Sequence, residues 1–166
     1  MHDPVRGGAA LAQFVRGAHA LRTLDVRGCA ITCSTLLEAL RHGAPKLSSL
    51  LLGHNRLTRH DIAALLALAS ATRALSRIDL SKTNLDAEAF AALLCTLQLN
   101  AHVREIRADA SHNGFGSLGA AIVGAVVPCI DKLKALHLRA VSKSGAAYAY
   151  ALEPPSDAPS GVGEGG

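Results

Sequence analysis

The sequence predicts an α/β fold built from repeated strand–helix units, and three observations lead to it. The pattern LxxLxLxxN/CxL recurs, as LRTLDVRGCAI (21–31), LSSLLLGHNRL (47–57) and LSRIDLSKTNL (75–85). Successive copies lie 26 to 30 residues apart. The segments between them carry apolar residues at helical spacing. Together these features are typical of a leucine-rich-repeat solenoid, a curved horseshoe segment with parallel strands on its concave face and helices on its convex face.

Two weaker copies, EIRADASHNGF (105–115) and LKALHLRAVSK (133–143), extend the repeat. The N/C position of the pattern, which we call the ladder position, is where the chain turns away from the strand. An Asn there bonds backbone groups that the bend leaves unpaired, a Thr does so in part, and a Val cannot. The ladder positions are Cys29, Asn55, Thr83, Asn113 and Val141, separated by 26, 28, 30 and 28 residues. We therefore expect the ladder to end at Val141.

Helices are expected between the strands. STLLEALRHG (34–43) carries a capping-box pattern, Thr35-x-x-Glu38. The segments 61–74 and 86–99 each open with Asp, which favours the N-cap or first turn of a helix. Residues 8–20 resemble the helix of a preceding, partial repeat.

The expected domain organisation follows from these repeats. Residues 1–20 form a partial N-terminal repeat, and residues 21–143 form a leucine-rich-repeat solenoid of about five repeats. Residues 144–166 form a ragged C-terminal end and a disordered tail, EPPSDAPSGVGEGG, because Pro, Gly and Ser cannot build a core. Residues 144–152 either begin a last helix or form the ragged edge. Neither end shows a polar cap, so the chain is interpreted as a piece of a longer horseshoe or a degenerate relative.

Composition limits the function. Hydrophobic residues make up 49% and aromatic residues only 3%, which predicts thin layers of small aliphatic side chains. The net charge is +4, but the basic residues are scattered without aromatics for base stacking, which argues against nucleic acid. The longest apolar run, AAIVGAVVPCI, is too short for a membrane span. With no signal-peptide pattern at the start, the four cysteines indicate free thiols and a cytoplasmic location.

The segment GFGSLG (114–119) offers one chemical alternative, because it matches the GxGxxG turn that holds a pyrophosphate at a helix N-terminus. The strand-like run LKALHL follows the helix, and Arg139 comes where an Arg could meet the 2′-phosphate of NADP. However, the preceding RADASHN is polar, whereas a buried parallel strand is a nearly continuous apolar run. The repeat also predicts the same strand–turn–helix unit elsewhere in the chain without glycines.

No catalytic constellation emerges. Cys29-x3-Cys33 lacks a second pair at zinc-ligand spacing, and no GxSxG, Walker or HExxH pattern occurs. Asp25, Asp79 and Asp109 are repeat-equivalent and should form a column along the sheet. We therefore expect a protein without enzymatic activity, metal or cofactor.

The residues between the leucines should face outward on the concave sheet, where solenoids bind partners. Six residues before the ladder position stand Thr23, Ser49, Arg77, Arg107 and Ala135. Four residues before it stand Asp25, Leu51, Asp79, Asp109 and His137. Two residues before it stand Arg27, Gly53, Ser81, Ser111 and Arg139. The predicted partner-binding residues are Asp25, Arg27, Arg77, Asp79, Arg107, Asp109, His137 and Arg139.

The third and fourth repeats thus offer Arg-x-Asp side by side. One interpretation is an ion-pair ladder across adjacent strands that satisfies itself and contributes little. The other is a polar docking surface for a protein partner, because the Arg fork pairs with carboxylates in a bidentate manner. Association with further repeats or with a second copy is a third partner hypothesis.

The stretch 21–141 resembles the ribonuclease-inhibitor-like leucine-rich repeats. Within it, LSRIDLSKTNLDAEAFAALL resembles the repeats of the CARMIL family of actin-capping-protein regulators. The resemblance implies a scaffold linked to actin filaments, and it carries over only the repeat platform. The matching positions are Leu24, Val26 and Cys29, then Leu50, Leu52 and Asn55, then Ile78, Leu80 and Thr83. The membrane-binding and capping-protein-binding segments of that family have no match here, so uncapping of filaments is assigned to no residue.

The function expected from the sequence is therefore a non-catalytic protein–protein interaction module or scaffold, linked to actin cytoskeleton regulation. Two alternatives stay open: an NADP-binding enzyme fragment that uses GFGSLG, and a purely structural fragment of a longer repeat array.

Overall fold

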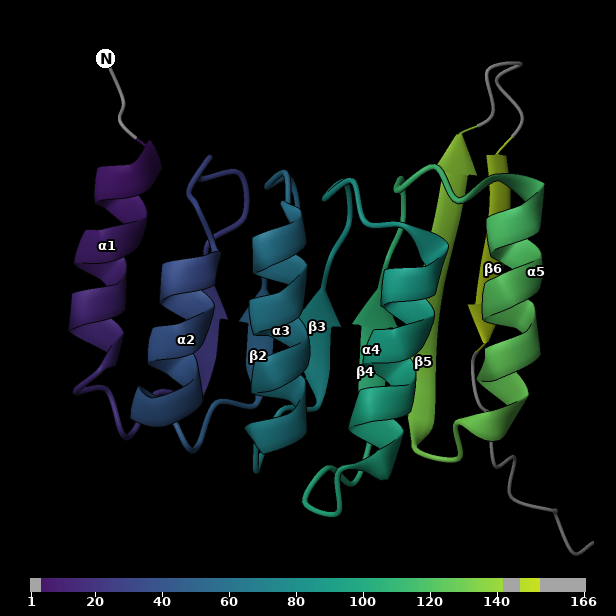
Figure 1. The fold of residues 1–166 in the computed structure, drawn as a ribbon. Helices are drawn as coiled ribbons and strands as arrows, with labels where there is room; N and C mark the ends of the chain where they lie inside the picture. Colours follow the sequence, from purple (N-terminus) through teal and green to yellow (C-terminus); the bar gives the residue numbers. More distant parts are fainter. Residues whose placement is uncertain (1–3, 142–146, 153–166) are drawn as a thin grey trace, which may run out of the picture.

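The computed structural model describes residues 4–141 and 147–152. Within them the chain forms one open sheet and a row of helices over one face of it (Figure 1). The helices are α1 (Pro4–Val15), α2 (Ser34–Gly43), α3 (Arg59–Ala71), α4 (Ala87–Leu99), α5 (Gly116–Val126) and the short 3₁₀ helix η1 (Val127–Cys129). The strands are β1 (Thr23–Asp25), β2 (Ser49–Leu51), β3 (Arg77–Asp79), β4 (Ile106–Asp109), β5 (Leu133–Val141) and β6 (Ala147–Leu152).

The strands lie in sequence order, β1-β2-β3-β4-β5-β6. The first five are parallel, and β6 pairs antiparallel with β5. Each parallel connection passes through a helix that packs beside the helix of the neighbouring unit. The predicted α/β class, with parallel strands in one layer and helices in the other, is confirmed, and the arrangement is compatible with a leucine-rich-repeat fold.

The repeat positions align across the sheet. Leu24 pairs with Leu50, Leu50 with Ile78, Ile78 with Ala108 and Ala108 with Leu136. Apart from half-buried Leu24, these side chains are buried in the layer between strands and helices. From the helix side, α4 contributes four residues at helical spacing, Phe90, Leu93, Leu94 and Leu97, all buried. The core is thus one thin apolar layer, as the aliphatic composition predicted.

The ladder positions bond the bends as expected. Asn55 Nδ2 donates to Val26 O at 2.7 Å and Leu52 O at 2.9 Å. Thr83 Oγ1 donates to Leu80 O at 2.7 Å, and Asn113 Nδ2 donates to the same oxygen at 2.7 Å. Cys29 departs from the pattern, because it is exposed and its Sγ lies 3.6 Å from Arg27 O. A thiol is a weak donor, so the first bend is held less firmly than the later ones.

Helix α2 spans the predicted residues, but the predicted capping box at its start is wrong. Its N-cap is Cys33, whose side chain makes no capping bond, and Thr35 lies within the helix. The cap comes instead from the next unit, where Asp61 Oδ1 accepts a hydrogen bond from Ser34 N–H. The same Asp61 forms a true capping box with Thr58 at the start of α3. Asp86 is the N-cap of α4, as its position predicted.

The two ends of the described chain differ from the interior. The N-terminal helix runs from Pro4 to Val15, earlier than the predicted 8–20. At the other end, β5 is nine residues long and extends to Val141, whereas β1 to β4 each end four residues before their ladder position. A valine at the ladder position cannot bond the backbone of a turn, which agrees with a strand that reaches this position. Residues 147–152 then form β6 and no helix, while the predicted tail 153–166 lies outside the described residues.

Candidate functional site

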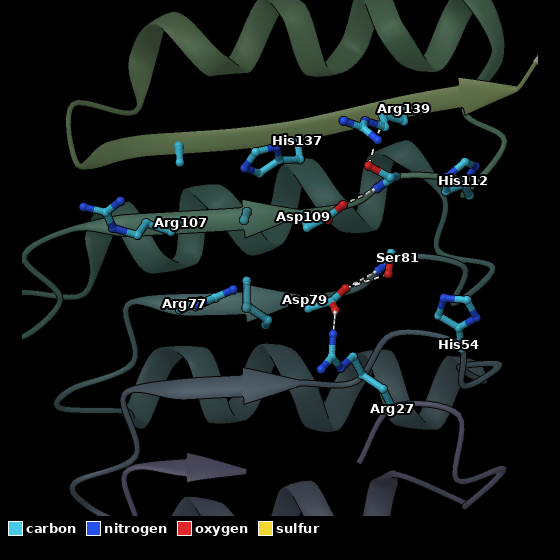
Figure 2. A pocket seen from close by; sticks show the side chains of 14 residues that line it. Arg27, His54, Arg77, Asp79, Ser81, Arg107, Asp109, His112, His137 and Arg139 are labelled. Carbon is cyan, nitrogen blue, oxygen red and sulfur yellow. Dashed lines mark hydrogen bonds and ion pairs between the residues drawn. The ribbon is translucent and has the colours of Figure 1, made fainter. Parts of the chain in front are cut away.

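A polar groove lies on the face of the sheet opposite the helices, with a volume of about 670 Å³ (Figure 2). We call it the sheet groove. Of the predicted partner-binding residues, Arg27, Arg77, Asp79, Arg107, Asp109, His137 and Arg139 line it. Asp25 is not among its lining residues, although it is bonded to Arg27. The repeat alignment therefore brought seven of its eight candidates to one surface.

The lining residues form rows because the strands are in register. Arg77 lies beside Arg107, and Asp79 lies beside Asp109. In the next strand along, His137 lies beside Asp109. Side chains two residues apart on a strand share a face, so the row of arginines, the row of aspartates and the Ser81 and Ser111 positions follow one another along the strands.

The aspartates of the second row are tied to the backbone that follows them. Asp79 Oδ1 accepts from Ser81 N–H at 2.9 Å and from Ser81 Oγ at 2.7 Å, and Asp109 Oδ1 accepts from Ser111 N–H at 2.9 Å. Asp25 does the same with Arg27 N–H at 3.1 Å. These bonds shape the end of each strand, so the aspartates have a structural role that the column of acids did not reveal.

At the N-terminal end of the sheet, Arg27 and Asp25 form a local ion pair with 2.7 Å between Nη2 and Oδ2. The Arg27 guanidinium, and then its backbone N–H, hold the pKa of the Asp25 carboxyl below its usual value. Arg27 also reaches the neighbouring unit, with 3.8 Å between its Nη1 and Asp79 Oδ2. This pair is thus largely satisfied within the chain.

Arg77 and Arg107, the row of arginines, have fewer partners within the chain than Arg27 has. Arg107 Nε lies 3.5 Å from Oε1 of Glu105, which directly precedes β4, and the Arg107 side chain is half exposed. Within residues 4–141 and 147–152, no ion pair or hydrogen bond joins the exposed Arg77 guanidinium to another group. The ladder of Arg–Asp pairs across β3 and β4 does not form, because the aspartates turn toward the serines (Figure 2).

Gly53 lies against the side chains of Asp79 and Ser81, which leave no room for a Cβ. A Cβ at this position would lie 2.7 Å from Ser81 Oγ and 2.9 Å from Asp79 Oδ1. The aspartate and serine of the third repeat therefore fold over a position where the second repeat has no side chain.

Sequence reasoning missed His54 and His112, which also line the sheet groove. Each directly precedes a ladder asparagine and has a positive φ, 61° and 63°. Gly28 and Lys82 hold the equivalent positions with φ of 65° and 52°. A left-handed residue thus precedes each of the first four ladder positions, and this places the two imidazoles at the same end of the groove (Figure 2).

The glycines of GFGSLG have structural explanations. Gly114 and Gly116 have φ of 70° and 63°, in the left-handed region. A Cβ on Gly119 would lie 2.9 Å from Ala87 Cβ and 2.8 Å from Phe115 Cβ, so this glycine lets α5 approach α4. The hollow beside the segment is lined by Asp86 and Glu88, whose negative charge disfavours a phosphate.

Within residues 4–141 and 147–152, no group of three or more His, Cys, Asp and Glu side chains is placed to hold a metal ion. In the same residues, no helix has the length and apolar character needed to cross a membrane.

Comparison with known proteins gives a consistent relationship. The chain is 25% identical over 127 residues to "Protein CARMIL" of Dictyostelium discoideum. It is 36% identical over 133 residues to "Capping protein, Arp2/3 and myosin-I linker protein 3" of Rattus norvegicus, and 36% over 116 residues to the protein of that name from Homo sapiens. The resemblance to CARMIL is confirmed.

The match covers 76% of this chain and 12% of the Dictyostelium protein. It covers 75% of this chain and 10% of the rat protein, and 67% of this chain and 8% of the human protein. The chain thus spans about a tenth of the length of the CARMIL proteins that it matches. No family model matches the sequence.

Proposed function

We propose that this chain is a non-catalytic protein–protein interaction module, a segment of a leucine-rich-repeat horseshoe that acts in the cytoplasm on the actin cytoskeleton. The sheet groove is its docking surface, with Arg27, Arg77, Asp79, Arg107, Asp109, His137 and Arg139 as contact residues and Asp25 as the partner of Arg27. The observation that carries the proposal is the row of Arg77 and Arg107, two exposed cations in register on adjacent strands.

The link to actin is supported by the names of the relatives. The rat and human proteins are described as linking capping protein, Arp2/3 and myosin-I. The proposed role of this chain is to hold one protein partner of such an assembly.

The test is capture of partners from a cell lysate by the full chain and by the Arg77→Glu/Arg107→Glu variant. Arg59→Glu/Arg56→Glu is the matched control, because both of these arginines are exposed and lie outside the sheet groove. The proposal expects actin regulators on the wild type and the control, and their loss from the groove variant. Equal capture by all three proteins would move the docking surface to the helices.

A second candidate, a structural fragment of a longer or self-associating array, is favoured by α5. Its side chains are almost all apolar, yet Gly119 and Val123 are its only buried residues, and Leu118 is 74% exposed. In contrast, α4 lies between two helices and buries six residues. A melting temperature that rises with protein concentration would support this candidate, because association stabilises the folded state by mass action.

A further inference from the structure

We infer that the sheet groove holds an extended partner segment whose charges alternate acidic, basic, acidic at every second residue. This inference rests on the proposed function, and it states the chemistry of the partner.

The first step is the pair of arginines. Arg77 and Arg107 are register partners on β3 and β4, so their backbones lie ~4.8 Å apart, the spacing of neighbouring strands. Like charges directly opposite one another on a sheet destabilise it. No group of the described chain bridges them, since Glu105 contacts Arg107 alone. A carboxylate from outside can lie between the two forks and accept from both, which turns this repulsion into binding.

The second step is the acid that remains open. Asp79 is engaged by Ser81 and Arg27, whereas Asp109, within the described residues, accepts only through Oδ1, from Ser111 N–H. Asp109 is half-buried and lies two residues beyond Arg107 on the same strand. Its second oxygen can therefore accept from a cationic side chain in the groove, at a position ~7 Å along the strand from the arginine row.

The third step is the far end of the sheet groove. Exposed Arg139 on β5 and exposed His112 line this end, beyond the aspartate row. Ser111 Oγ accepts from Arg139 N–H at 3.0 Å, which fixes the backbone that carries this arginine. The rows across β3, β4 and β5 follow one another at two-residue steps. The first row holds Arg77 and Arg107, the second Asp79 and Asp109, and the third Arg139 of β5 beside Ser111, so the rows change from positive to negative to positive. An extended segment repeats its side chains at the same step, so the complementary sequence is acidic-x-basic-x-acidic.

The probe is a peptide, Ser-Glu-Ser-Lys-Ser-Glu-Ser with blocked ends, titrated into the ¹⁵N-labelled full chain at low salt. Its charge-reversed control is Ser-Lys-Ser-Glu-Ser-Lys-Ser. We expect amide shifts centred on β3 and β4, and binding roughly tenfold tighter for the first peptide, since opposite charges favour one order and like charges oppose the other. Equal binding of the two peptides, or no shift up to about 2 mM, the range of very weak complexes, would overturn the inference.

Variants locate the effect. Arg77→Gln/Arg107→Gln should lose roughly tenfold in affinity for the first peptide, and Arg59→Gln should lose nothing. Thermal melts of both variants show whether the fold is retained, and removal of two facing cations should leave the melting temperature equal or higher. If inorganic phosphate alone shifts the same amides as strongly as the peptide, the arginine row is a phosphate site and the inference is wrong.

The outcome is separable from that of the proposed function. If the groove variant loses a lysate partner but the peptides are not distinguished, the interaction role holds and the charge order is wrong. If the peptides are distinguished but the wild type captures no actin regulator, the charge order holds and the link to actin fails.

Discussion

Asn113 completes a turn that lies 30 residues earlier, because its Oδ1 accepts a hydrogen bond from Thr83 N–H at 2.9 Å. The same oxygen accepts from Leu85 N–H at 3.2 Å. Asn113 Nδ2 donates to Leu80 O and to Ala110 O, at 2.7 and 3.0 Å. Thr83, at the third ladder position, has only a hydroxyl with which to bond its own bend. The side-chain amide of Asn113 therefore bonds the bends of both the third and the fourth repeat.

We therefore predict that Asn113→Ala lowers the free energy of unfolding by about 3 kcal/mol, because it leaves several buried backbone groups without partners. Urea denaturation measures this change. Asn113→Asp keeps the acceptor and loses the donors, so it separates the bonds to Thr83 and Leu85 from those to the two carbonyls. A loss below about 0.5 kcal/mol in Asn113→Ala, the level of an ordinary surface change, would contradict this account.

Asp61 joins two helices, and its removal should cost more than the loss of an ordinary cap. It is 1% exposed, and its carboxylate accepts from Ser34 N–H at the start of α2 and from Thr58 N–H at the start of α3. We predict that Asp61→Ala lowers the free energy of unfolding by about 3 kcal/mol, since each cap contributes about 1 kcal/mol and a buried donor is left unpaired.

The control for Asp61 is Asp86→Ala, which removes an exposed N-cap that serves α4 alone. It should cost about 1 kcal/mol. Equal losses in the two variants, measured by the same urea titration, would show that the bond from Asp61 to Ser34 contributes nothing.

The contrast between Asn113 and Asp61 shows what the sequence could predict. The ladder residues recur at a fixed spacing, so the strands, their register and the rows of the sheet groove followed from the repeat alone. The bond from Ser34 to Asp61 spans 27 residues and occurs where Cys33, at the N-cap, offers no capping oxygen. A pattern search within α2 therefore selected Thr35, which the structure places inside the helix.

The histidines of the sheet groove and the C-terminal strand β6 were harder to predict for a related reason. His54 and His112 line the groove because of a left-handed backbone position, which no side-chain pattern marks. The AYAYAL sequence of β6 alternates with a period of two, the signal of a strand, but the repeat left open only a last helix or a ragged edge at that place. The ion-pair ladder between the Arg-x-Asp repeats of β3 and β4, one of the two interpretations of the sequence, does not form, because Asp79 and Asp109 bond the nearer serines.

The thiols should differ sharply in reactivity. Cys29, Cys95 and Cys129 are exposed, whereas Cys33 is buried. Desolvation by burial, with a smaller effect of the Asp61 carboxylate, raises the pKa of the Cys33 thiol to about 12 from 9.0. At pH 8 the folded chain should therefore react with a thiol reagent at three cysteines, and at Cys33 only on unfolding, because the thiolate is the reactive form.

The raised pKa of Cys33 also sets a direction for stability at high pH. The folded state holds this proton more tightly than the unfolded state, so the contribution is complete below pH 9.0 and is lost as the pH rises toward about 12. Cys33→Ala should flatten the fall in unfolding free energy across this window. A fall of the same steepness in the variant would assign it to other groups.

The glycines of GFGSLG provide the last prediction, because they decide between a turn of the repeat and a phosphate loop. Gly116 has a φ of 63° and open space around its Cα, so Gly116→Ala introduces backbone strain without a clash. We predict a loss of about 1 kcal/mol in unfolding free energy, the cost of a left-handed alanine. Gly124→Ala is the matched control, since Gly124 lies in α5 with open space and no positive φ. It should gain about 0.5–1 kcal/mol, because alanine favours the helix.

Cofactor binding separates the two interpretations of these glycines. In the repeat interpretation, calorimetry with NADP shows no binding to the wild type, and the variants differ only in stability. If the wild type binds NADP and Gly116→Ala abolishes binding while its fold is retained, GFGSLG holds a phosphate despite Asp86 and Glu88 beside it. Gly116→Ala should lower the unfolding free energy and Gly124→Ala should raise it. This comparison is made without any ligand, so it tests the repeat interpretation separately from NADP binding.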